Sequence, residues 1–532
     1  MRRGSTPGRI LSSRTPSIDV NRTQVWLPTA GEMAALDRDA TASGHTTERT
    51  LIETAGREVA RQVALRFPEG PVAALLGSGH NGADALVALR SLRAWGRDVT
   101  AVRCGSSLPD PEVRAGWELE VREPSALEAT CRSAAVVLDG LLGTGVTGAP
   151  REPAATFIAQ LNAISGPVVA VDGPSGADFT TGRTPGACVR ATVTVCLGWP
   201  KLGLLLHPAR GYCGELVCVE IGFPPFAGDR FGARAITARW ATELLIERGP
   251  EAHKGEAGYL VLVAGQAGMA GASVLAARSA VRAGAGIVRV VGDPANRIVL
   301  QSAVPEALFV GWDDDRAVRE SLEWADAVAV GPGLGGGPER RGLVQRMLEG
   351  RGGRPVVVDA DGLNAFAGRM EALANLLDGT AVITPHPGEL ARLRGGELSA
   401  ILEDRPGAAR ATARDLGVPV LLKGIPALVA LPAGPLRVAT AGGPAVASGG
   451  SGDVLTGIVG AYLAAGLGPA DAATAALMIG GLAADRSPCP EGHLPTDVPD
   501  RLPVVRAGMT SASPPPPGPV LFSLPASRSA GG

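Results

Sequence analysis

Residues 447–466 read ASGGSGDVLTGIVGAYLAAG, a run of small residues that leads into Asp453 at the start of a predicted helix. Successive backbone N–H groups in such a loop form a concavity for anions, and the positive end of the helix dipole strengthens it. An aspartate at this place can take a proton from a hydroxyl that attacks a bound phosphate. The alternative is an aspartate that only caps a helix. The long small-residue helix that follows favours the phosphate-binding interpretation.

Short apolar runs alternate with Ala-rich helical stretches before this element. Continuous apolar runs of this kind predict parallel strands that are covered by helices on both faces. A polar stretch at 223–236 interrupts the pattern, which then restarts, so we predict two αβ domains that meet near residue 235. The predicted strands are 72–76, 99–103, 135–139, 168–172, 192–197 and 216–221 in the first half, and 259–265, 286–291, 327–331, 356–360, 381–385 and 419–424 in the second.

The composition excludes several classes of partner. The 532-residue chain carries 50 basic and 52 acidic residues, so it lacks the basic excess that binding to nucleic acid or anionic lipid requires. Arginine supplies 47 of the basic residues, and the three lysines are Lys201, Lys254 and Lys423. The seven cysteines are odd in number and form no CxxC pair, which indicates a reducing, cytoplasmic setting.

The two ends of the chain differ in composition from the rest. Residues 1–22 are rich in Arg, Ser and Thr without an apolar core, so we predict a disordered leader. Residues 508–532 form a Pro- and Ser-rich tail that we also predict to be disordered. The longest apolar run, 454–470, is diluted by Gly and Ala and suits a buried helix better than a membrane span. The two domains are then 23–235 and 236–507.

Three strand-end loops of the first domain carry its candidate chemistry. In open αβ sheets, ligands bind beyond the carboxyl ends of the strands. GSGHNGADA (77–85) runs from a strand into a helix, which suits a pyrophosphate as well as it suits a tight turn. Asp139 and Asp172 end two further strands, where a lone aspartate is most often a turn former. Together, Asn81, Asp139 and Ser175 offer oxygens for a cation and leave Asp172 for acid–base work.

The runs GSGHNGAD, DGLLGTG, VDGPSG and WPKLGLLLHPAR resemble the NAD(P)H-hydrate epimerase domain. That resemblance implies a Rossmann-like three-layer fold, a K⁺ ion, and interconversion of the R and S forms of NADH or NADPH hydrated at carbon 6 of the ring. It implies K⁺ ligands at Asn81, Asp139 and Ser175, and ring contact by Asp172. The residues that it implies for binding substrate phosphates are His80, Asn81, Gly82, Ala83, Asp84, Gly143, Thr144, Gly145, Val146, Thr147, Gly148 and Ala149.

Four more strand-end loops surround the opening motif in the second domain: GPGLGGG (331–337), DADGLN (359–364), TPHPGE (384–389) and LKGIPALV (422–429). Asp359, Asp361 and Asn364 are candidates to coordinate a hydrated metal or to hold ribose hydroxyls. His386 lies between two prolines that fix its direction, which favours a ligand contact over a structural role. Lys423 ends a buried strand, where its ammonium can reach a nucleotide phosphate.

These blocks, with HKGEAGYLVLVAG (253–265), residues 267–288 and PEALFV (305–310), resemble the NAD(P)H-hydrate dehydratase domain, which has a ribokinase-like α/β/α fold. That family removes water from the S hydrate at the expense of ADP or ATP, and Mg²⁺ accompanies the nucleotide. The resemblance implies that Asp453 is the catalytic base. It implies hydrate contacts at Ala272, Gly333, His386 and Asp453, and nucleotide contacts at Lys423, Gly424, Ile425, Pro426, Ala427 and Gly452.

Both halves depart from the usual family pattern. This chain has HNGADA where the family usually has NNGGDG, and DGPSG where the family usually has DIPSG. These changes leave open that the epimerase activity is reduced. After Lys423 this chain has GIPA where the family usually has GAGT, and TAGGPAVASGG lacks the Asn that usually follows TG. The affinity for the nucleotide, or the preference between ADP and ATP, is therefore left open.

The leading hypothesis is a bifunctional enzyme that repairs damaged nicotinamide cofactors, acting on small molecules and on neither nucleic acid nor membranes. The alternative is a ribokinase-like small-molecule kinase with a non-catalytic, ligand-binding N-terminal domain. The choice between ADP and ATP, the choice between NADH and NADPH hydrates, coupling between the sites, and assembly into a homo-oligomer all stay open.

Overall fold

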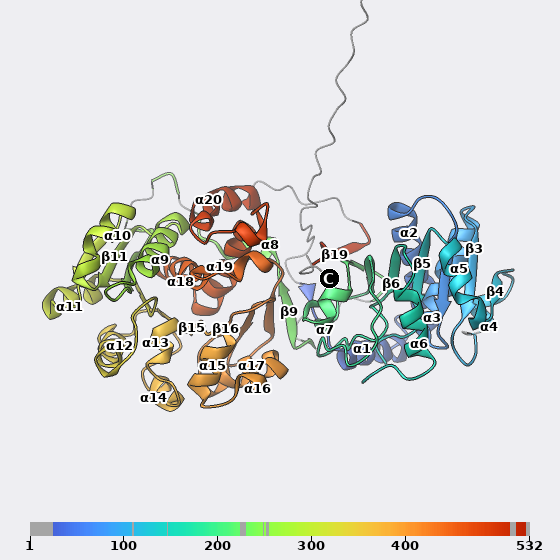
Figure 1. Cartoon of the computed structure of the whole chain (residues 1–532), viewed down its shortest axis with the longest axis horizontal. Coiled ribbons are helices and arrows are strands. Elements are labelled where there is room, and N and C mark those ends of the chain that lie inside the picture. The colour runs from blue at the N-terminus through green and yellow to red at the C-terminus, as the bar shows by residue number, and fades with distance from the viewer. Residues whose placement is uncertain are drawn as a thin grey trace, which may run out of the picture.

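Two αβ lobes lie side by side in the computed structural model, with β9 between them (Figure 1). The structure describes residues 25–108, 111–145, 147–223, 230–247, 249–251, 255–510 and 518–527. The predicted leader, Val146 and Lys254 lie outside these ranges. No helix in the described ranges combines the length and apolar character that a membrane span requires.

The first lobe is built on an eight-stranded sheet with the order β19-β8-β7-β6-β5-β2-β3-β4. Its strands run parallel except for β19, which is antiparallel to β8. The strands are β2 (Val72–Leu76), β3 (Val99–Arg103), β4 (Glu120–Arg122), β5 (Val136–Gly140), β6 (Val168–Val171), β7 (Val193–Leu197), β8 (Glu215–Val219) and β19 (Val520–Leu524). The helices are α1 (Ala30–Ala42), α2 (Glu48–Arg66), α3 (His80–Ala94), α4 (Pro111–Arg114), η1 (Pro124–Ala126), α5 (Leu127–Ser133), α6 (Ala154–Asn162), α7 (Leu202–Leu205) and η2 (Ala209–Tyr212).

The second lobe is built on an eleven-stranded mixed sheet with the order β1-β9-β18-β17-β16-β15-β14-β13-β10-β11-β12. The strands are β1 (Val25–Trp26), β9 (Ala233–Ile236), β10 (Tyr259–Val263), β11 (Ile287–Gly292), β12 (Leu308–Gly311), β13 (Ala327–Val330), β14 (Val356–Val358), β15 (Ala381–Ile383), β16 (Val420–Leu422), β17 (Leu428–Ala430) and β18 (Leu436–Ala439). The helices are α8 (Ala238–Leu244), α9 (Ala270–Ala283), η4 (Pro294–Asn296), α10 (Arg297–Ala303), α11 (Asp315–Trp324), α12 (Pro338–Gly350), α13 (Ala360–Asn364), α14 (Met370–Ala374), α15 (Pro387–Arg394), α16 (Leu398–Glu403), α17 (Arg405–Leu416), η5 (Pro444–Val446), α18 (Ser451–Ala464), α19 (Pro469–Asp485), η6 (Pro490–Gly492) and α20 (Asp497–Thr510).

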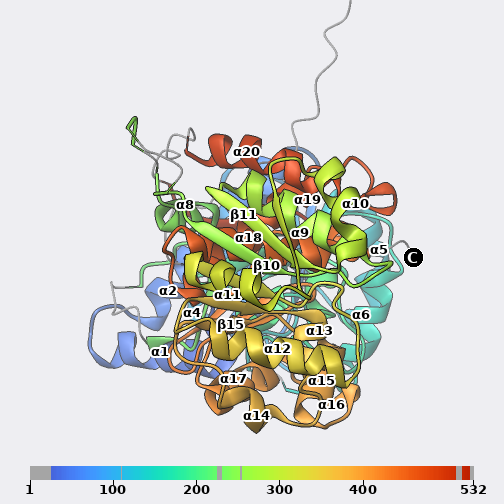
Figure 2. The ribbon, with the colours of Figure 1, turned by 90° about the vertical axis from the view of Figure 1, so that its left-hand side faces the viewer.

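The alternation of buried side chains explains why the strands are apolar throughout. Along β10, Leu260 and Leu262 join the core beneath α9 and α18, whereas Val261 and Val263 join the core on the opposite face. Successive residues of a strand point to opposite faces, so a sheet with helices on both sides needs apolar residues at every position. Figure 2 shows the helices of the second lobe around β10 and β11. The predicted doubly covered parallel strands are confirmed.

The ends of the chain connect the two lobes. Strand β1 pairs antiparallel with β9 in the second sheet, although residues 25–26 were expected in the first domain. One hydrophobic cluster continues from Leu204 and Phe522 in the first lobe to Val261 and Val438 in the second. The predicted division into 23–235 and 236–507 therefore crosses β9.

The prediction of a disordered tail from 508 to 532 is wrong for the described part. Helix α20 extends to Thr510, and β19 covers the edge of β8 with Phe522 fully buried. The Pro- and Ser-rich composition concealed a five-residue strand, Val520–Leu524, whose apolar side chains complete the core of the first lobe. Residues 511–517 and 528–532 lie outside the described ranges.

Candidate active sites

Helix α18 presents Asp453 at the carboxyl edge of the second sheet. The helix begins after Gly450, whose φ of 97° lies in the left-handed region that favours glycine. Close packing on α9 holds the helix in place, since a Cβ at Gly457 would lie 2.1 Å from the carbonyl oxygen of Ala276. Asp453 lies in the first helical turn. Burial, and secondarily the charge of Asp359, raises the pKa of Asp453 to about 6. This carboxyl group is therefore poised to exchange a proton near neutral pH.

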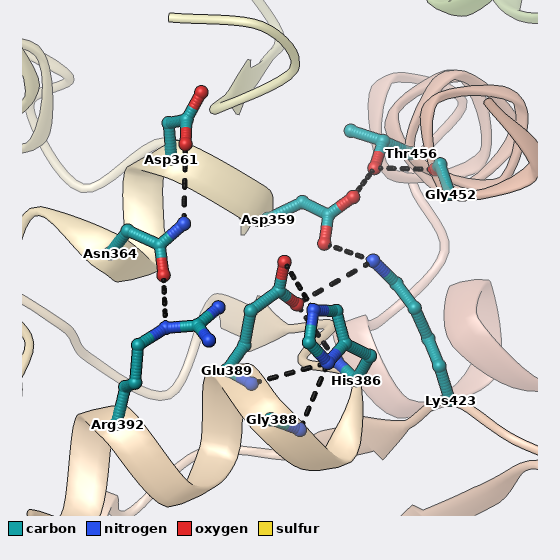
Figure 3. Close-up of polar contacts among 10 residues, drawn as sticks. All are labelled: Asp359, Asp361, Asn364, His386, Gly388, Glu389, Arg392, Lys423, Gly452 and Thr456. Carbon is teal, nitrogen blue, oxygen red and sulfur yellow. Dashed lines mark hydrogen bonds and ion pairs between the residues drawn. The ribbon is translucent and has the colours of Figure 1, made fainter. Parts of the chain in front are cut away.

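Lys423 is held beside the same helix by a buried network (Figure 3). Its Nζ lies 2.5 Å from Oδ1 of Asp359, and Thr456 donates to Oδ2 of Asp359 at 2.6 Å. Although burial disfavours the ammonium charge, Asp359 and Glu389 raise the pKa of Lys423. A Cβ at Gly452 would lie 3.1 Å from Nζ of Lys423, so this glycine lets the ammonium approach the helix N-terminus. The arrangement places the ammonium beside the positive end of the helix dipole, where a phosphate would sit.

His386 both caps a helix and lines a cavity. Its Nδ1 accepts hydrogen bonds from the backbone N–H groups of Gly388, at 2.9 Å, and Glu389, at 3.2 Å. Nδ1 is thereby an acceptor, so the neutral ring carries its proton on Nε2, which lies 3.4 Å from Oε1 of Glu389. The structural and ligand-binding interpretations of His386 are thus compatible.

The three polar residues of the 359–364 loop do not converge on one point. Asp359 is committed to Lys423 and Thr456, whereas Asp361 accepts from the backbone N–H of Gly335 at 2.8 Å and from Asn364 at 3.2 Å. The described residues contain no cluster of three His, Cys, Asp or Glu side chains that could hold a metal ion.

A cavity of about 350 Å³ opens from this network between α18, α19 and the loop after β16. Its wall includes most of the residues predicted to bind nucleotide, with His386: Lys423, Gly424, Ile425, Ala427 and Gly452. Pro426 does not line it. Instead, the carbonyl oxygen of Pro426 accepts a hydrogen bond from Arg405 at 2.7 Å.

Ala272 and Gly333, two predicted hydrate contacts, lie next to each other. A Cβ at Gly333 would be 2.8 Å from that of Ala272, and the carbonyl oxygen of Gly333 accepts from the N–H of Gln266 at 2.7 Å. Ala272 lies at the start of α9, which packs along α18. Both positions therefore lie beside the packed pair of helices α9 and α18, and α18 carries Asp453.

The three predicted K⁺ ligands of the first lobe converge. Asp139 is fully buried at the end of β5 and accepts from Ser175 Oγ at 2.6 Å and from Ser175 N at 2.8 Å. Asn81 donates to the carbonyl oxygen of Leu142 at 2.9 Å, and the N–H of Leu142 donates to Ser175 Oγ at the same distance. Burial raises the pKa of Asp139 to about 6. One carboxylate among neutral oxygens matches a singly charged cation.

Asp172 is held in an unusual conformation by a buried lysine. Its φ of 64° lies in the left-handed region, which aspartate tolerates better than most residues. The carboxylate accepts from the N–H of Leu197 at 3.0 Å and forms an ion pair with Lys201, whose side chain is 1% exposed. Burial raises the pKa of nearby Asp84 well above its ordinary value, and burial likewise raises that of Asp37.

The predicted phosphate loops vary in exposure. His80 is exposed and pairs with Glu48 at 2.7 Å. The side chain of Ala83 packs in the core, and its backbone N–H donates to the carbonyl oxygen of Gly79. Neither the side chain nor the N–H of Ala83 therefore faces a ligand directly. Gly82 permits a tight turn, because a Cβ there would be 2.1 Å from the carbonyl oxygen of Gly77. Gly143 lies against Asn81, and the exposed positions of the second loop are Gly145, Thr147, Gly148 and Ala149, with Thr144 half-buried.

Comparisons with known proteins match both lobes. The profile of the NAD(P)H-hydrate dehydratase family matches residues 260–503, and that of the YjeF-related protein N-terminus matches 48–203. A bifunctional NAD(P)H-hydrate repair enzyme of Salinibacter ruber is 36% identical over 90% of this chain and 96% of that protein. The Escherichia coli enzyme of the same name is 39% identical over 77% of this chain and 79% of that protein.

The chain belongs to the family of bifunctional NAD(P)H-hydrate repair enzymes.

Family membership confirms the predicted enzyme class and the predicted order of domains, an epimerase-type half followed by a ribokinase-like half. The alternative of a small-molecule kinase with a non-catalytic N-terminal domain is not favoured. Among solved structures, an ADP/ATP-dependent NAD(P)H-hydrate dehydratase from Bacillus subtilis, co-crystallized with ATP/Mg²⁺, is 28% identical and has a TM-score of 0.46. It matches 51% of this chain and 97% of that one.

Several residues of this repair enzyme's sites were not found from its sequence. Thr456 lies one helical turn after Gly452, so helical spacing alone would have placed it on the same face. Glu389 completes the capping box of α15, and His386 occupies the N-cap position that Ser, Thr or Asp usually takes. Arg405 holds the loop of Lys423 through three carbonyl oxygens, and no local signal in the sequence marks it.

Proposed function

We propose that the second lobe removes water from the S hydrate of NADH or NADPH with consumption of ADP or ATP, and that the first lobe interconverts the R and S hydrates. The observation that carries the proposal is the position of Asp453, with a pKa of about 6, in the first turn of α18 beside the buried ammonium of Lys423. Residues 236–507 carry the dehydratase activity and 23–235 the epimerase activity. Strand β1, from the N-terminal part, joins the sheet of the second lobe, and β19, from the C-terminal part, joins the sheet of the first lobe.

Asp453 acts as the base for the dehydration. It takes the proton from the ring hydroxyl, whose oxygen then attacks the terminal phosphorus of the nucleotide while the bond to the bridging oxygen breaks. The phosphorylated oxygen is a good leaving group, so electrons from the ring nitrogen expel it as phosphate. Loss of a proton from the neighbouring ring carbon restores the dihydropyridine.

Lys423 and the start of α18 stabilise the charge on the nucleotide phosphates during that transfer. The ammonium stays protonated because Asp359 and Glu389 raise its pKa. Hydrogen bonds from Arg405 to the carbonyl oxygens of Lys423 and Pro426 keep this loop in place. His386 lines the cavity from a capped helix end, which suits a contact with the hydrate.

The residues fit a Mg²⁺ ion that arrives with the nucleotide. Mg²⁺ commonly keeps several waters and binds through substrate phosphates with one or two carboxylates, and the described residues offer no cluster of three carboxylates here. Asp361 is a candidate for such a carboxylate, because its hydrogen-bond partners are one backbone N–H and one side-chain amide, and neither carries a charge. Bound Mg²⁺ would neutralise phosphate charge.

In the first lobe, we propose that Asn81, Asp139 and Ser175 hold K⁺. Asp139 is a buried carboxylate that receives hydrogen bonds, within the described part of the chain, only from uncharged groups, so a monovalent cation would balance its charge. K⁺ would fix the loops that receive the substrate phosphates. Asp172, oriented by Lys201, would contact the reacting ring and exchange a proton there.

We also propose a cytoplasmic location and small-molecule substrates alone. All seven cysteines lie in the described ranges and none of them forms a disulfide bond, which agrees with a reducing compartment.

The coupled assay on R-hydrate tests both halves of the proposal. With ADP or ATP and Mg²⁺, the enzyme should restore the absorbance of the dihydropyridine near 340 nm faster than spontaneous epimerisation allows. Recovery from S-hydrate but not from R-hydrate would reject the epimerase half. No recovery from either hydrate would reject the dehydratase half.

A further inference from the structure

His493 is a buried side chain that the proposed reaction does not use. It follows η6 and precedes α20, and it is 5% exposed. Its ring lines the same cavity as Lys423 and Gly452. Nothing in the family resemblance or in the loop pattern of the sequence pointed to this residue.

Neither ring nitrogen of His493 has a hydrogen-bond partner in the described part of the chain. Buried polar groups are almost always paired, so an unpaired one in a cavity wall indicates a partner that the cavity receives. Burial, reinforced by the charge of Arg501, lowers the pKa of His493, while Asp497 and Asp485 act in the opposite direction. The ring is therefore neutral near pH 7 and offers one donor and one acceptor.

The cavity has one polar end and one apolar end. Lys423 and Gly452 mark the polar end, beside the α18 N-terminus. Much of the rest of the wall is aliphatic and includes Val446, Leu455, Ile458, Leu477 and Val498. Helix η6, directly before His493, lies against η5, which carries Val446. A ligand with phosphates at Lys423 would thus place a flat apolar ring among these side chains, within the stretch of wall that contains His493.

We propose that His493 hydrogen-bonds the purine base of the bound adenine nucleotide. The inference rests on the proposed function, which places a nucleotide in this cavity. The edge of adenine offers an amino donor and a ring-nitrogen acceptor, and a neutral imidazole can complement either of them. The aliphatic side chains of the wall cannot pair these groups, and the two serines that line it, Ser448 and Ser451, hydrogen-bond each other at 2.9 Å. His493 is therefore the residue that makes burial of the base favourable. It is a specificity-determining residue and takes no part in phosphoryl transfer.

The test separates binding of the base from binding of the phosphates. Full-length wild type, His493→Phe and His493→Gln are titrated by calorimetry with ADP and, separately, with inorganic tripolyphosphate, which lacks a base. Phe keeps an aromatic ring of similar size without polar atoms, and Gln restores a donor and an acceptor. Leu494→Ala is the matched control, because this neighbouring side chain is 59% exposed and does not line the cavity.

We expect His493→Phe to weaken ADP binding roughly tenfold, equivalent to about 1.4 kcal/mol, with tripolyphosphate binding within about twofold of wild type. His493→Gln should recover part of the loss, and Leu494→Ala should bind both ligands normally. Unchanged ADP affinity in His493→Phe would overturn the inference and leave the proposed function intact, as would an equal loss for both ligands. Absence of ADP binding by wild type would overturn both.

Discussion

The raised pKa of Asp453 predicts how the dehydration depends on pH. A general base must be deprotonated to act, so the rate of the chemical step follows the deprotonated fraction of Asp453. With a pKa of about 6, that fraction is about nine-tenths at pH 7 and about one-tenth at pH 5. The single-turnover rate should therefore fall roughly tenfold between pH 7 and pH 5 and change little above pH 7.

The assay follows recovery of absorbance near 340 nm from S-hydrate in single turnovers with saturating ADP and Mg²⁺, with enzyme-free blanks subtracted at each pH. Asp453→Asn preserves the shape of the side chain and cannot accept the proton. Loss of a positioned general base costs about 100- to 10,000-fold, so this variant should be slowed by that factor with ADP binding unchanged. Its residual rate should be flat between pH 5 and pH 7.

Glu389 supplies the necessary control, because burial also raises its pKa. If Glu389 caused the acidic decline, Glu389→Gln would remove the decline and Asp453→Asn would keep it. That result would refute the assignment of the base. A rate independent of pH in wild type would refute it as well, because the buried carboxyl group then would not titrate in the step that limits the rate.

Three further predictions concern the first lobe. Replacing K⁺ by tetramethylammonium should slow R-to-S conversion at least roughly tenfold without slowing dehydration of S-hydrate, and Asn81→Ala should blunt the response to K⁺. A cation-independent rate would contradict the proposed site. Lys201→Met leaves the Asp172 carboxylate without its partner, so urea unfolding should show a loss of about 3–5 kcal/mol in this lobe. Phe522→Ala should destabilise the same lobe by about 3–5 kcal/mol, whereas the control Ser523→Ala should cost less than about 0.5 kcal/mol. Equal effects of the two substitutions would show that β19 contributes nothing to the hydrophobic core.

The sequence predicted twelve of the nineteen strands that the structure describes, because each of the twelve is a continuous apolar run. Strands buried on both faces must be apolar at every position, and this pattern is visible without knowledge of the partner strands. It missed seven strands, among them β17, which begins inside the stretch 422–429 that was interpreted as a loop. The two missed strands nearest the ends of the chain have different determinants. Val25–Trp26 and Val520–Leu524 are short and depend on distant edges, those of β9 and β8, for their hydrogen bonds. Local sequence cannot reveal pairing that spans hundreds of residues.

The candidate sites divide in the same way. Residues at strand ends, such as Asp139, Ser175 and Lys423, were predictable because the carboxyl ends of parallel strands meet at one edge. Arg405 and His493 come from the start of a helix and from a loop, where no pattern relates position to function. Asp359 was expected to bind metal or ribose, and the structure shows it paired with Lys423. Only the position of Lys423 relative to Asp359 distinguishes these roles.

The two described lysines show why an arginine-rich chain keeps lysine at both sites. Lys201 pairs with Asp172 and Lys423 with Asp359, each at the carboxyl end of a parallel strand. The Lys201 ammonium also donates to the carbonyl oxygen of Leu197 at 3.0 Å, inside a fully enclosed pocket. A guanidinium would bring five N–H donors into that space, and each buried donor left unpaired costs about 1–3 kcal/mol. At Lys423, a wider head group would also meet the backbone at Gly452, where there is room for an ammonium because the residue lacks a Cβ. The small buried sites that hold these two ion pairs therefore favour the compact ammonium of lysine, whereas the exposed surface accepts arginine.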